Sequence, residues 1–283
     1  MNSVNRKSSN KPILKMNHQD DIRLLVFVRP SKNQPASALE KRMHAFLKTG
    51  EGTESLDDKA FSTLHGTGQI ADYLLWNRQF IAEMKAVNGY PVQRIERLID
   101  DETRKEPRMF VFGEVGIQKI LSSRSNGTEI NRMMVNIGGR PIRKLLQQAN
   151  PQITDTRTKL ALPGAAGLAI IMIDKPQKIE AGVAAYAVRE ALRAAKPRLD
   201  EIDFVWVSIE THTVRLPDGR TGFPELGIWR ANRRPDIDRA MIGQMFDAWA
   251  AFNGTEMEHL DHTSSWETLT PIGDGWPLKL DLH

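Results

Sequence analysis

The 283-residue sequence contains no cysteine. This absence excludes disulfide bonds, zinc–thiolate sites, iron–sulfur clusters and catalysis by a thiol. Any reaction that the chain catalyses must therefore use oxygen and nitrogen groups. The sequence also lacks a Gly-x-Ser-x-Gly motif, which removes the simplest kind of serine hydrolase.

Long hydrophobic runs are missing as well. The best candidate, residues 164–173, is bounded by Pro163 and by Asp174 and Lys175, and it is much shorter than the roughly 18 apolar residues of a membrane span. The N-terminal residues carry no apolar run of the kind found in a secretory signal. We therefore expect a soluble, cytoplasmic protein that does not act at a membrane.

Charge is distributed unevenly along the chain. Residues 1–20 hold four Lys or Arg residues and no acid before Asp20, whereas residues 255–283 hold six acids and one base, Lys279. The composition of the whole chain, 40% hydrophobic and 26% charged, is that of a globular protein. We expect a flexible basic arm over 1–20, one α/β domain over 21–254 and an acidic C-terminal segment over 255–283.

The hydrophobic pattern predicts both helices and strands in the central domain. We expect strands at 22–28, 71–76, 79–87, 109–112, 168–173 and 204–209, and helices at 36–48, 141–149, 151–160, 180–195 and 235–252. Residues 213–222 have the Pro-Asp-Gly turn of a hairpin, and 226–229 could form an edge strand. The order strand–helix–strand over 168–209 indicates parallel pairing within a mixed sheet.

The two strands at 71–76 and 79–87 form the most informative feature. Asn77 and Arg78 between them predict a hairpin with a two-residue turn. This register places Asp72 opposite Glu83, and strand alternation points Lys85 to the same face as Glu83. Two like charges directly opposite each other are destabilising, so we expect another group to compensate for them.

Carboxylates with spare oxygens are the ligands that Mg²⁺ or Mn²⁺ prefers. An ion held by Asp72 and Glu83 could activate water and stabilise charge on a phosphodiester, while Lys85 positions the nucleophile or neutralises the phosphate oxygens. The alternative is a structural ion pair between Glu83 and Lys85, since an acid-x-Lys triplet alone has little specificity.

An Asp at the start of one strand, followed by an apolar strand carrying Glu-x-Lys, resembles the PD-(D/E)XK, or restriction-endonuclease-like, superfamily of nucleases. The matching stretches are ADYLLW and FIAEMKAV, with Ala71 where the motif often has Pro. The run LLQQANPQITDTRTKLALPGAAGLAIIMID further resembles uncharacterised bacterial members. The motif covers about 72–85, and the looser resemblance covers about 69–174.

The resemblance implies an α/β fold with a restriction-endonuclease-like core, in which helices flank a central mixed β-sheet, here with a C-terminal extension. It also implies divalent-metal-dependent cleavage of phosphodiesters and a further acid from an upstream helix. Glu40 matches that third metal ligand by position, although a solvated surface residue explains it equally well. Gln152 could support the site from a later helix, or could be an ordinary capping residue.

A basic region follows the hairpin. Residues 116–160 contain eight Lys or Arg residues against two acids, and we expect four of them, Arg140, Arg143, Lys144 and Arg157, to contact nucleic-acid phosphates. The glycines in Gly138-Gly139-Arg140-Pro141 could present backbone N–H groups to a phosphate. A solvated charged face is the alternative interpretation.

The sequence thus predicts a metal-dependent nuclease, with DNA more favoured than RNA as its substrate and with Asp72, Glu83 and Lys85 as its catalytic residues. The alternative is a non-catalytic nucleic-acid-binding or interaction protein that keeps the fold and uses the three residues as a structural ion pair. A homodimer is possible, because enzymes that cut both strands are commonly two-fold dimers, although no coiled-coil repeat indicates one.

Overall fold

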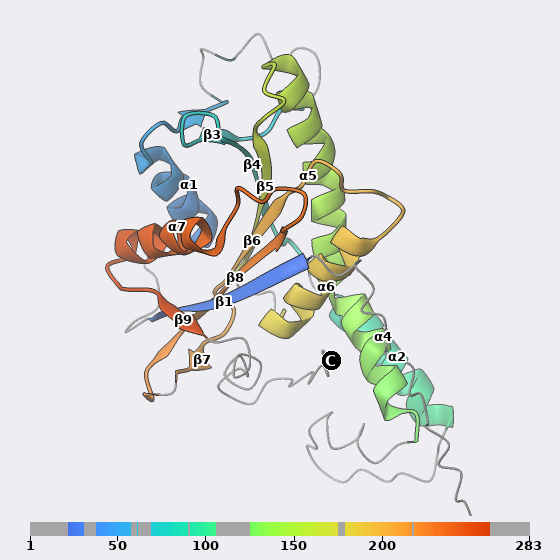
Figure 1. The fold of residues 1–283 in the computed structure, drawn as a ribbon. Helices are drawn as coiled ribbons and strands as arrows, with labels where there is room; N and C mark the ends of the chain where they lie inside the picture. The colour runs from blue at the N-terminus through green and yellow to red at the C-terminus, as the bar shows by residue number, and fades with distance from the viewer. Residues whose placement is uncertain are drawn as a thin grey trace, which may run out of the picture.

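Nine strands in the described part of the chain form one mixed β-sheet (Figure 1). The computed structural model describes residues 22–30, 38–57, 61, 69–89, 91–105, 125–174, 179–216 and 218–260. The expected basic arm over 1–20 and the expected strand over 109–112 lie outside these residues.

The helices and strands alternate along the chain. Their order is β1 (Ile22–Pro30), α1 (Leu39–Thr49), β2 (Glu54–Ser55), β3 (Tyr73–Leu75), β4 (Phe80–Ala86), α2 (Val92–Lys105), α4 (Gly127–Gly138), α5 (Arg140–Lys159), β5 (Ala166–Ile173), α6 (Ala181–Arg193), β6 (Phe204–Ile209), β7 (Val214–Arg215), β8 (Thr221–Arg230), α7 (Arg239–Phe252) and β9 (Glu258–Leu260). No helix among the described residues has both the length and the apolar character that crossing a membrane requires.

The strand order in the sheet is β2-β3-β4-β5-β6-β8-β1-β9, with β7 pairing to β8. The central pairs β4–β5 and β5–β6 are parallel, and the remaining pairs are antiparallel. Parallel neighbours need long crossovers, and α6 provides the one between β5 and β6. The prediction of an α/β fold with a mixed sheet between helices is confirmed.

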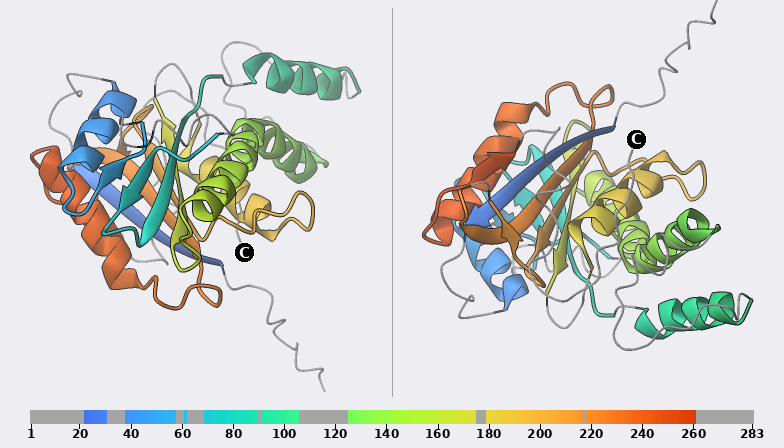
Figure 2. Two further views of the ribbon diagram at one scale, coloured as in Figure 1. Left: turned by 90° about the horizontal axis from the view of Figure 1, so that it is seen from above. Right: turned by 90° about the horizontal axis from the view of Figure 1, so that it is seen from below.

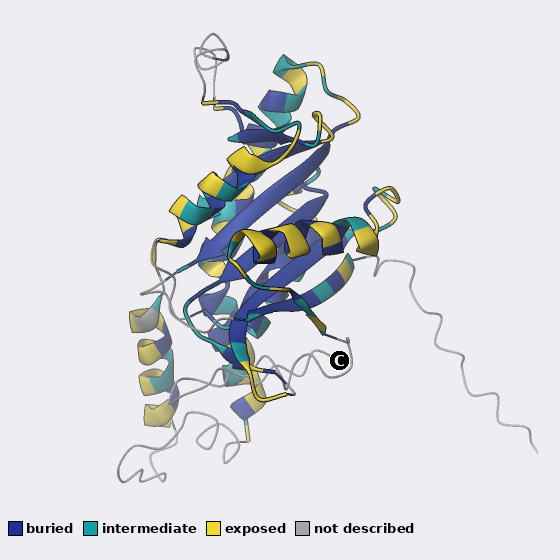
Figure 3. Cartoon of the chain, turned by 90° about the vertical axis from the view of Figure 1, so that its left-hand side faces the viewer, coloured by how far each residue is buried: buried dark blue, intermediate teal, exposed yellow. Residues whose placement is uncertain are grey.

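Each face of the sheet has its own hydrophobic core. Helices α1 and α7 cover one face, and α5 and α6 cover the other, as the views from above and below show (Figure 2). The strands between them are almost entirely buried, whereas the outer sides of the helices are exposed (Figure 3). We call the two faces of the sheet the α1/α7 face and the α5/α6 face, after the helices that cover them.

Helix α5 corrects one sequence expectation. The two helices expected to meet at Pro151 are a single helix of 20 residues with Pro151 inside it. Proline lacks the N–H that would bond to the carbonyl four residues earlier, which is that of Gln147. Both Pro151 and Gln147 are exposed, so water can take the place of the missing donor.

Strand β8 corrects another expectation. Residues 226–229 were expected to form an edge strand, but they lie in β8, which pairs with β6 on one side and with β1 on the other. The helix expected from residue 235 begins later, at Arg239, because the side chain of Asp238 caps it by accepting a hydrogen bond from the backbone N–H of Met241 at 2.7 Å.

The boundary expected at residues 254–255 is also wrong. Strand β9 lies beyond it and pairs with β1 through Val26, Phe27 and Val28. Within β9, His259 contacts the ring of Phe27 edge-on and lies 3.0 Å from the Asp247 carboxylate. The start of the acidic segment therefore belongs to the sheet, and residues 261–283 lie outside the described part of the chain.

Candidate functional site

The hairpin of β3 and β4 has the predicted register. Tyr73, Leu74 and Leu75 pair with Ala82, Ile81 and Phe80 respectively. Asn77 and Arg78 occupy the turn with positive φ angles of 52° and 68°, which a type I′ turn requires at both central positions. Arg suits this conformation poorly, but the guanidinium of Arg78 helps to hold the turn by donating to both carboxylate oxygens of Glu54, at 2.7 and 2.8 Å.

Asp72 departs from the ladder by one position. Its backbone N–H donates to the carbonyl of Ala82 at 3.1 Å, and its own carbonyl accepts from Leu56 at 2.9 Å. Ala82 is already the partner of Tyr73, so the chain bends before β3 and Asp72 is not directly opposite Glu83 as expected. Its carboxylate instead accepts a hydrogen bond from the backbone N–H of Met84 in β4 at 2.7 Å.

Glu83 and Lys85 lie on the α5/α6 face. Their neighbours in and directly after β4 show this, because Ile81 and Val87 belong to the core on that face and Ala82 and Met84 to the core on the other. Glu83 is buried with 1% of its surface exposed, while the Lys85 side chain keeps 22% exposed and contacts the Glu83 Oε1 atom. The sequence prediction that both residues share one face is confirmed.

The environment of Glu83 favours its protonated form. The pKa of Glu83 is raised to about 8, mainly by burial and in part by the negative charge of Asp72, and the hydrogen bond from Lys85 opposes both effects. The second carboxylate oxygen, Oε2, is buried without a hydrogen-bond partner among the described residues. A buried acceptor of this kind costs about 1–3 kcal/mol.

Asp72 is also held at a raised pKa. Burial is the main cause, and the hydrogen bond from Met84 and the positive charge of Lys85 lower the pKa in part. The negative charge of Asp57 also raises the pKa of Asp72. Asp57 is therefore a third carboxylate close enough to affect the hairpin. Asp57 stands in an acid-x-Lys triplet that reads as an ordinary loop in the sequence, so only the pairing of β2 with β3 brings it here.

Helix α5 fixes the backbone that leads into Asp72. The side-chain amide of Gln152 donates to the carbonyl of Ile70 at 3.3 Å. The hydroxyl of Thr156, one turn further along, accepts from the backbone N–H of Ala71 at 2.7 Å and donates to the Gln152 carbonyl at 2.8 Å. Gln152 therefore supports the site through the chain at Ile70. Sequence reasoning missed Thr156, although its spacing of four residues from Gln152 places both on one face of the helix.

The structure does not bring Glu40 to this cluster. Glu40 is exposed in the first turn of α1. That helix packs its buried residues Leu39, Met43 and Leu47 on the α1/α7 face, across the sheet from Glu83. The expected role of Glu40 as a third metal ligand therefore has no geometric support. The alternative interpretation, a solvated surface residue, agrees with its exposure.

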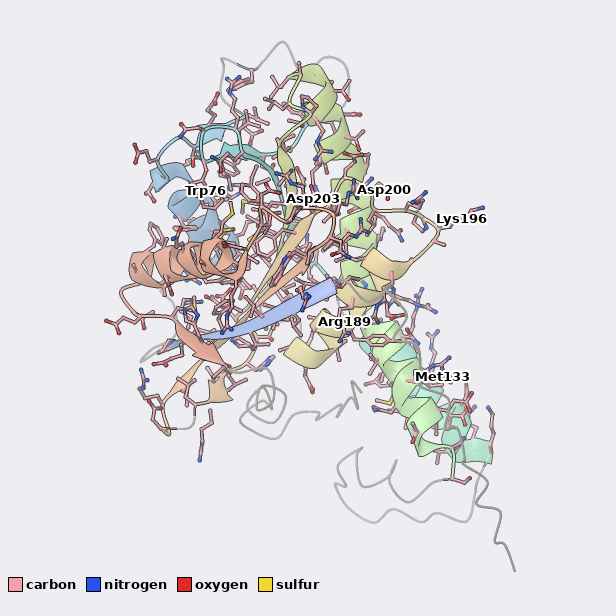
Figure 4. All side chains as sticks on the ribbon, viewed as in Figure 1. Trp76, Met133, Arg189, Lys196, Asp200 and Asp203 are labelled. Atoms are coloured by element: carbon pink, nitrogen blue, oxygen red, sulfur yellow. The ribbon has the colours of Figure 1, made fainter. Side chains whose placement is uncertain are left out.

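Two of the four residues expected to bind phosphate, Arg143 and Arg157, are engaged within the protein. Arg157 pairs with Glu201, lies 3.8 Å from Asp203 and donates to the carbonyl of Ala165 at 3.0 Å. Asp203 lies beside α5 at the end of the sheet where β6 begins (Figure 4). Arg143 is half-buried and donates to the carbonyl of Asn136 at 2.5 Å. These internal contacts give no support to the expectation that the two arginines meet phosphates.

The expected phosphate loop at Gly138 and Gly139 is a helix junction. The N–H of Gly139 donates to the carbonyl of Val135 at 2.9 Å, so α4 runs almost directly into α5. A Cβ atom on Gly139 would lie 2.6 Å from the Cβ atom of Ala187 in α6. Glycine is needed here because α6 packs closely against the junction.

Arg140 and Lys144, in contrast, are exposed on α5. Together with Arg94 of α2 they line a cavity of about 360 Å³ at the end of β4. Sequence reasoning missed Arg94, because nothing in the pattern of α2 indicates that it meets α5.

The donor set fits a divalent cation of the Mg²⁺ type. Glu83 offers an oxygen without a partner, and the Asp72 carboxylate has a single described hydrogen bond. Among the described residues no group of three His, Asp or Glu side chains is placed to hold a metal ion. Two carboxylates are nonetheless a common protein contribution to Mg²⁺ sites, where water and substrate phosphates complete the shell.

Comparison with known protein families, with curated proteins and with solved structures finds no match to this chain.

Proposed function

We propose that this protein is a divalent-metal-dependent nuclease that hydrolyses phosphodiester bonds of nucleic acid, with DNA favoured over RNA. The observation that carries the proposal is the placement of Asp72 and Lys85 around Glu83, a buried carboxylate with one oxygen unpartnered. Such a strongly perturbed acid beside a lysine is typical of functional sites.

Asp72 and Glu83 would hold Mg²⁺ or Mn²⁺, which would supply Lewis-acid stabilisation of charge on the phosphate and a more acidic water. The residues themselves do the positioning. The Met84 N–H orients the Asp72 carboxylate, and α5 fixes the backbone before it through Gln152 and Thr156.

Lys85 would be the group nearest the solvent side of the site. Part of its side chain is exposed, whereas Glu83 is not. If Glu83 held a cation, the ammonium group of Lys85 would be free to leave Glu83 and to donate to a non-bridging phosphate oxygen. A positive group placed where negative charge develops is a large contribution to catalysis of phosphoryl transfer.

The alternative function is a nucleic-acid-binding or interaction protein in which the three residues form a structural ion pair. The direct contact between Lys85 and Glu83 favours it. The two proposals differ in the response to Asp72→Asn. In a nuclease this change abolishes cleavage while stability holds or rises, because it removes a largely buried negative charge and keeps an oxygen to accept from Met84. In a structural network it destabilises the fold.

The deciding experiment is a cleavage assay on plasmid, linear and single-stranded DNA and on RNA, each with Mg²⁺, Mn²⁺ or EDTA. Wild type is compared with Lys85→Ala and Asp72→Asn, and with Lys48→Ala, an exposed lysine of α1, as the matched control. We expect metal-dependent cutting that both site variants lose by at least about 100-fold, the usual scale for such groups, and that the control keeps.

Absence of cutting on every substrate, with nucleic-acid binding retained by all four proteins, would overturn the nuclease proposal and favour the binding protein. Circular dichroism of each variant separates loss of function from loss of fold.

A further inference from the structure

The cavity between the end of β4, α2 and the start of α5 has the composition of an anion site. Arg94, Arg140 and Lys144 contribute three positive charges, and no acidic side chain is among the described residues that line it. All three cations are exposed, and none forms an ion pair with a described carboxylate. Arg143 and Arg157, in contrast, form hydrogen bonds or ion pairs within the protein.

The floor of the cavity is apolar. Val87, Pro91, Pro141 and Leu145 line it together with the amide side chains of Asn88 and Gln148. Its volume of about 360 Å³ is within the range of small-molecule sites, which combine apolar walls with a few polar groups. A bare phosphate would use the cations and leave the apolar floor unfilled, whereas a nucleotide would use both.

The cavity also lies on the same side of the sheet as the carboxylate site. Val87, the residue after β4, belongs to the core on this face and follows Glu83 by four residues, a separation of about 13 Å at the rise of a strand. Along α5, Lys144, Gln148 and Gln152 share one helix face at intervals of four residues, so this face connects the cavity to the residue that contacts Ile70. One nucleic-acid strand can therefore extend from the carboxylates to the cavity.

We infer that this cavity binds one unpaired nucleotide unit of the nucleic acid, with the phosphate on Arg94, Arg140 and Lys144 and the sugar and base against the apolar floor. The inference rests on the proposed function for the identity of its ligand as part of a nucleic-acid strand. A cavity of about 360 Å³ has room for a single nucleotide unit, whereas a base pair with its two sugar-phosphate units is larger. The protein therefore prefers single-stranded segments or strand ends to continuous duplex.

The test measures binding in EDTA, so that it does not depend on cleavage. Fluorescence anisotropy follows a labelled single-stranded oligodeoxythymidine and a duplex closed by hairpins at both ends, titrated with full-length wild type, Arg94→Gln and Lys144→Gln. Arg97→Gln is the matched control, because Arg97 is an exposed arginine of the same helix that does not line the cavity.

We expect each cavity variant to weaken binding of the single strand by at least about tenfold, the loss expected for one hydrogen bond to a charged group. Each should also flatten the dependence of log affinity on log salt by about 0.7. Binding of the closed duplex should change by less than about twofold, as should binding of both ligands to Arg97→Gln. Equal losses in the cavity variants and the control would overturn the inference, because they would indicate general charge attraction only.

Competition separates a nucleotide from a phosphate. Thymidine 5′-monophosphate should displace the oligonucleotide at a lower concentration than inorganic phosphate does at matched ionic strength, and this difference should vanish in Arg94→Gln. Equal potency of the two competitors would overturn the assignment to a nucleotide. The outcome is independent of catalysis, since a protein that never cuts but shows this pattern contradicts the proposed nuclease function and supports the cavity assignment.

Discussion

Glu83 couples the candidate site to the stability of the fold. An acid whose pKa is raised on folding stabilises the protein below its unfolded pKa, and this contribution is lost as pH rises through the folded pKa. With a folded pKa of about 8, Glu83 therefore makes the free energy of unfolding fall as pH rises from about 4.5 to 8. The loss is at most about 1.4 kcal/mol per pH unit.

Glu83→Gln should remove this dependence. Urea denaturation without metal at pH 5, 6, 7 and 8 should give a free energy of unfolding that falls with pH more steeply in wild type than in the variant. In the wild type, adding Mn²⁺ at pH 7 should release up to about one proton, because the carboxylate must ionise to bind the ion; calorimetry in buffers of different ionisation enthalpy measures it. Parallel pH profiles for the two proteins would show that Glu83 is ionised in the fold.

Single residues differ in how far the sequence predicts them. The turn at Asn77 and Arg78 sets the register of the hairpin, so the shared face of Glu83 and Lys85 follows from local rules. The bend at Asp72 does not, because it depends on a hydrogen bond to Ala82 and on contacts from Leu56 and α5. The ion pairs of Arg157 are likewise invisible in the sequence, since Glu201 and Asp203 come from a distant loop.

At the scale of elements, α5 is the helix that shapes the site. It packs on β4 and β5, and its residues Gln152 and Thr156 hold the chain before Asp72. The extent of α5 was predicted wrongly because of Pro151, since a proline inside a helix costs about 3 kcal/mol. The burial of Ile142, Leu146 and Ile153 against the sheet offsets this cost, and the sequence alone does not show that packing.

Thr156→Val tests the role of α5. The change leaves the buried N–H of Ala71 without an acceptor, so the free energy of unfolding should fall by about 1–3 kcal/mol. Cleavage should fall as well, because Asp72 loses part of its support. Thr158→Val is the control, since Thr158 is exposed and its hydroxyl, as far as the described residues go, bonds to the Thr154 carbonyl of its own helix alone. Its effect should stay within about 0.5 kcal/mol. If both variants unfold alike in urea, α5 does not hold the site through Thr156.

Across the whole molecule, the sheet separates two polar clusters. On the α1/α7 face, Glu225 is completely buried and accepts from Arg29 at 3.2 Å and from the indoles of Trp206 and Trp249, both at 2.9 Å. Arg29 also pairs with Glu210. Unlike Glu83, Glu225 has partners on both oxygens, which indicates a structural network. Its strands β1 and β8 are about 200 residues apart in the sequence, which is why no local pattern predicts the strand order.

Arg29→Met should therefore affect stability without affecting the reaction. Among the described residues Arg29 is the one cation paired with Glu225, so removing it leaves a buried carboxylate without a counter-charge, which costs about 3–5 kcal/mol. Burial raises the pKa of Glu225 and Arg29 lowers it, so the loss should be smaller at pH 5, where the stranded group is more readily protonated, than at pH 8. Tryptophan fluorescence in urea measures both values, since Trp206 and Trp249 contact the network directly. Protein that remains folded should cleave at the wild-type rate, because the sheet lies between Arg29 and Glu83. A folded variant that has lost cleavage would place the α1/α7 face in the active machinery and contradict a site confined to the α5/α6 face.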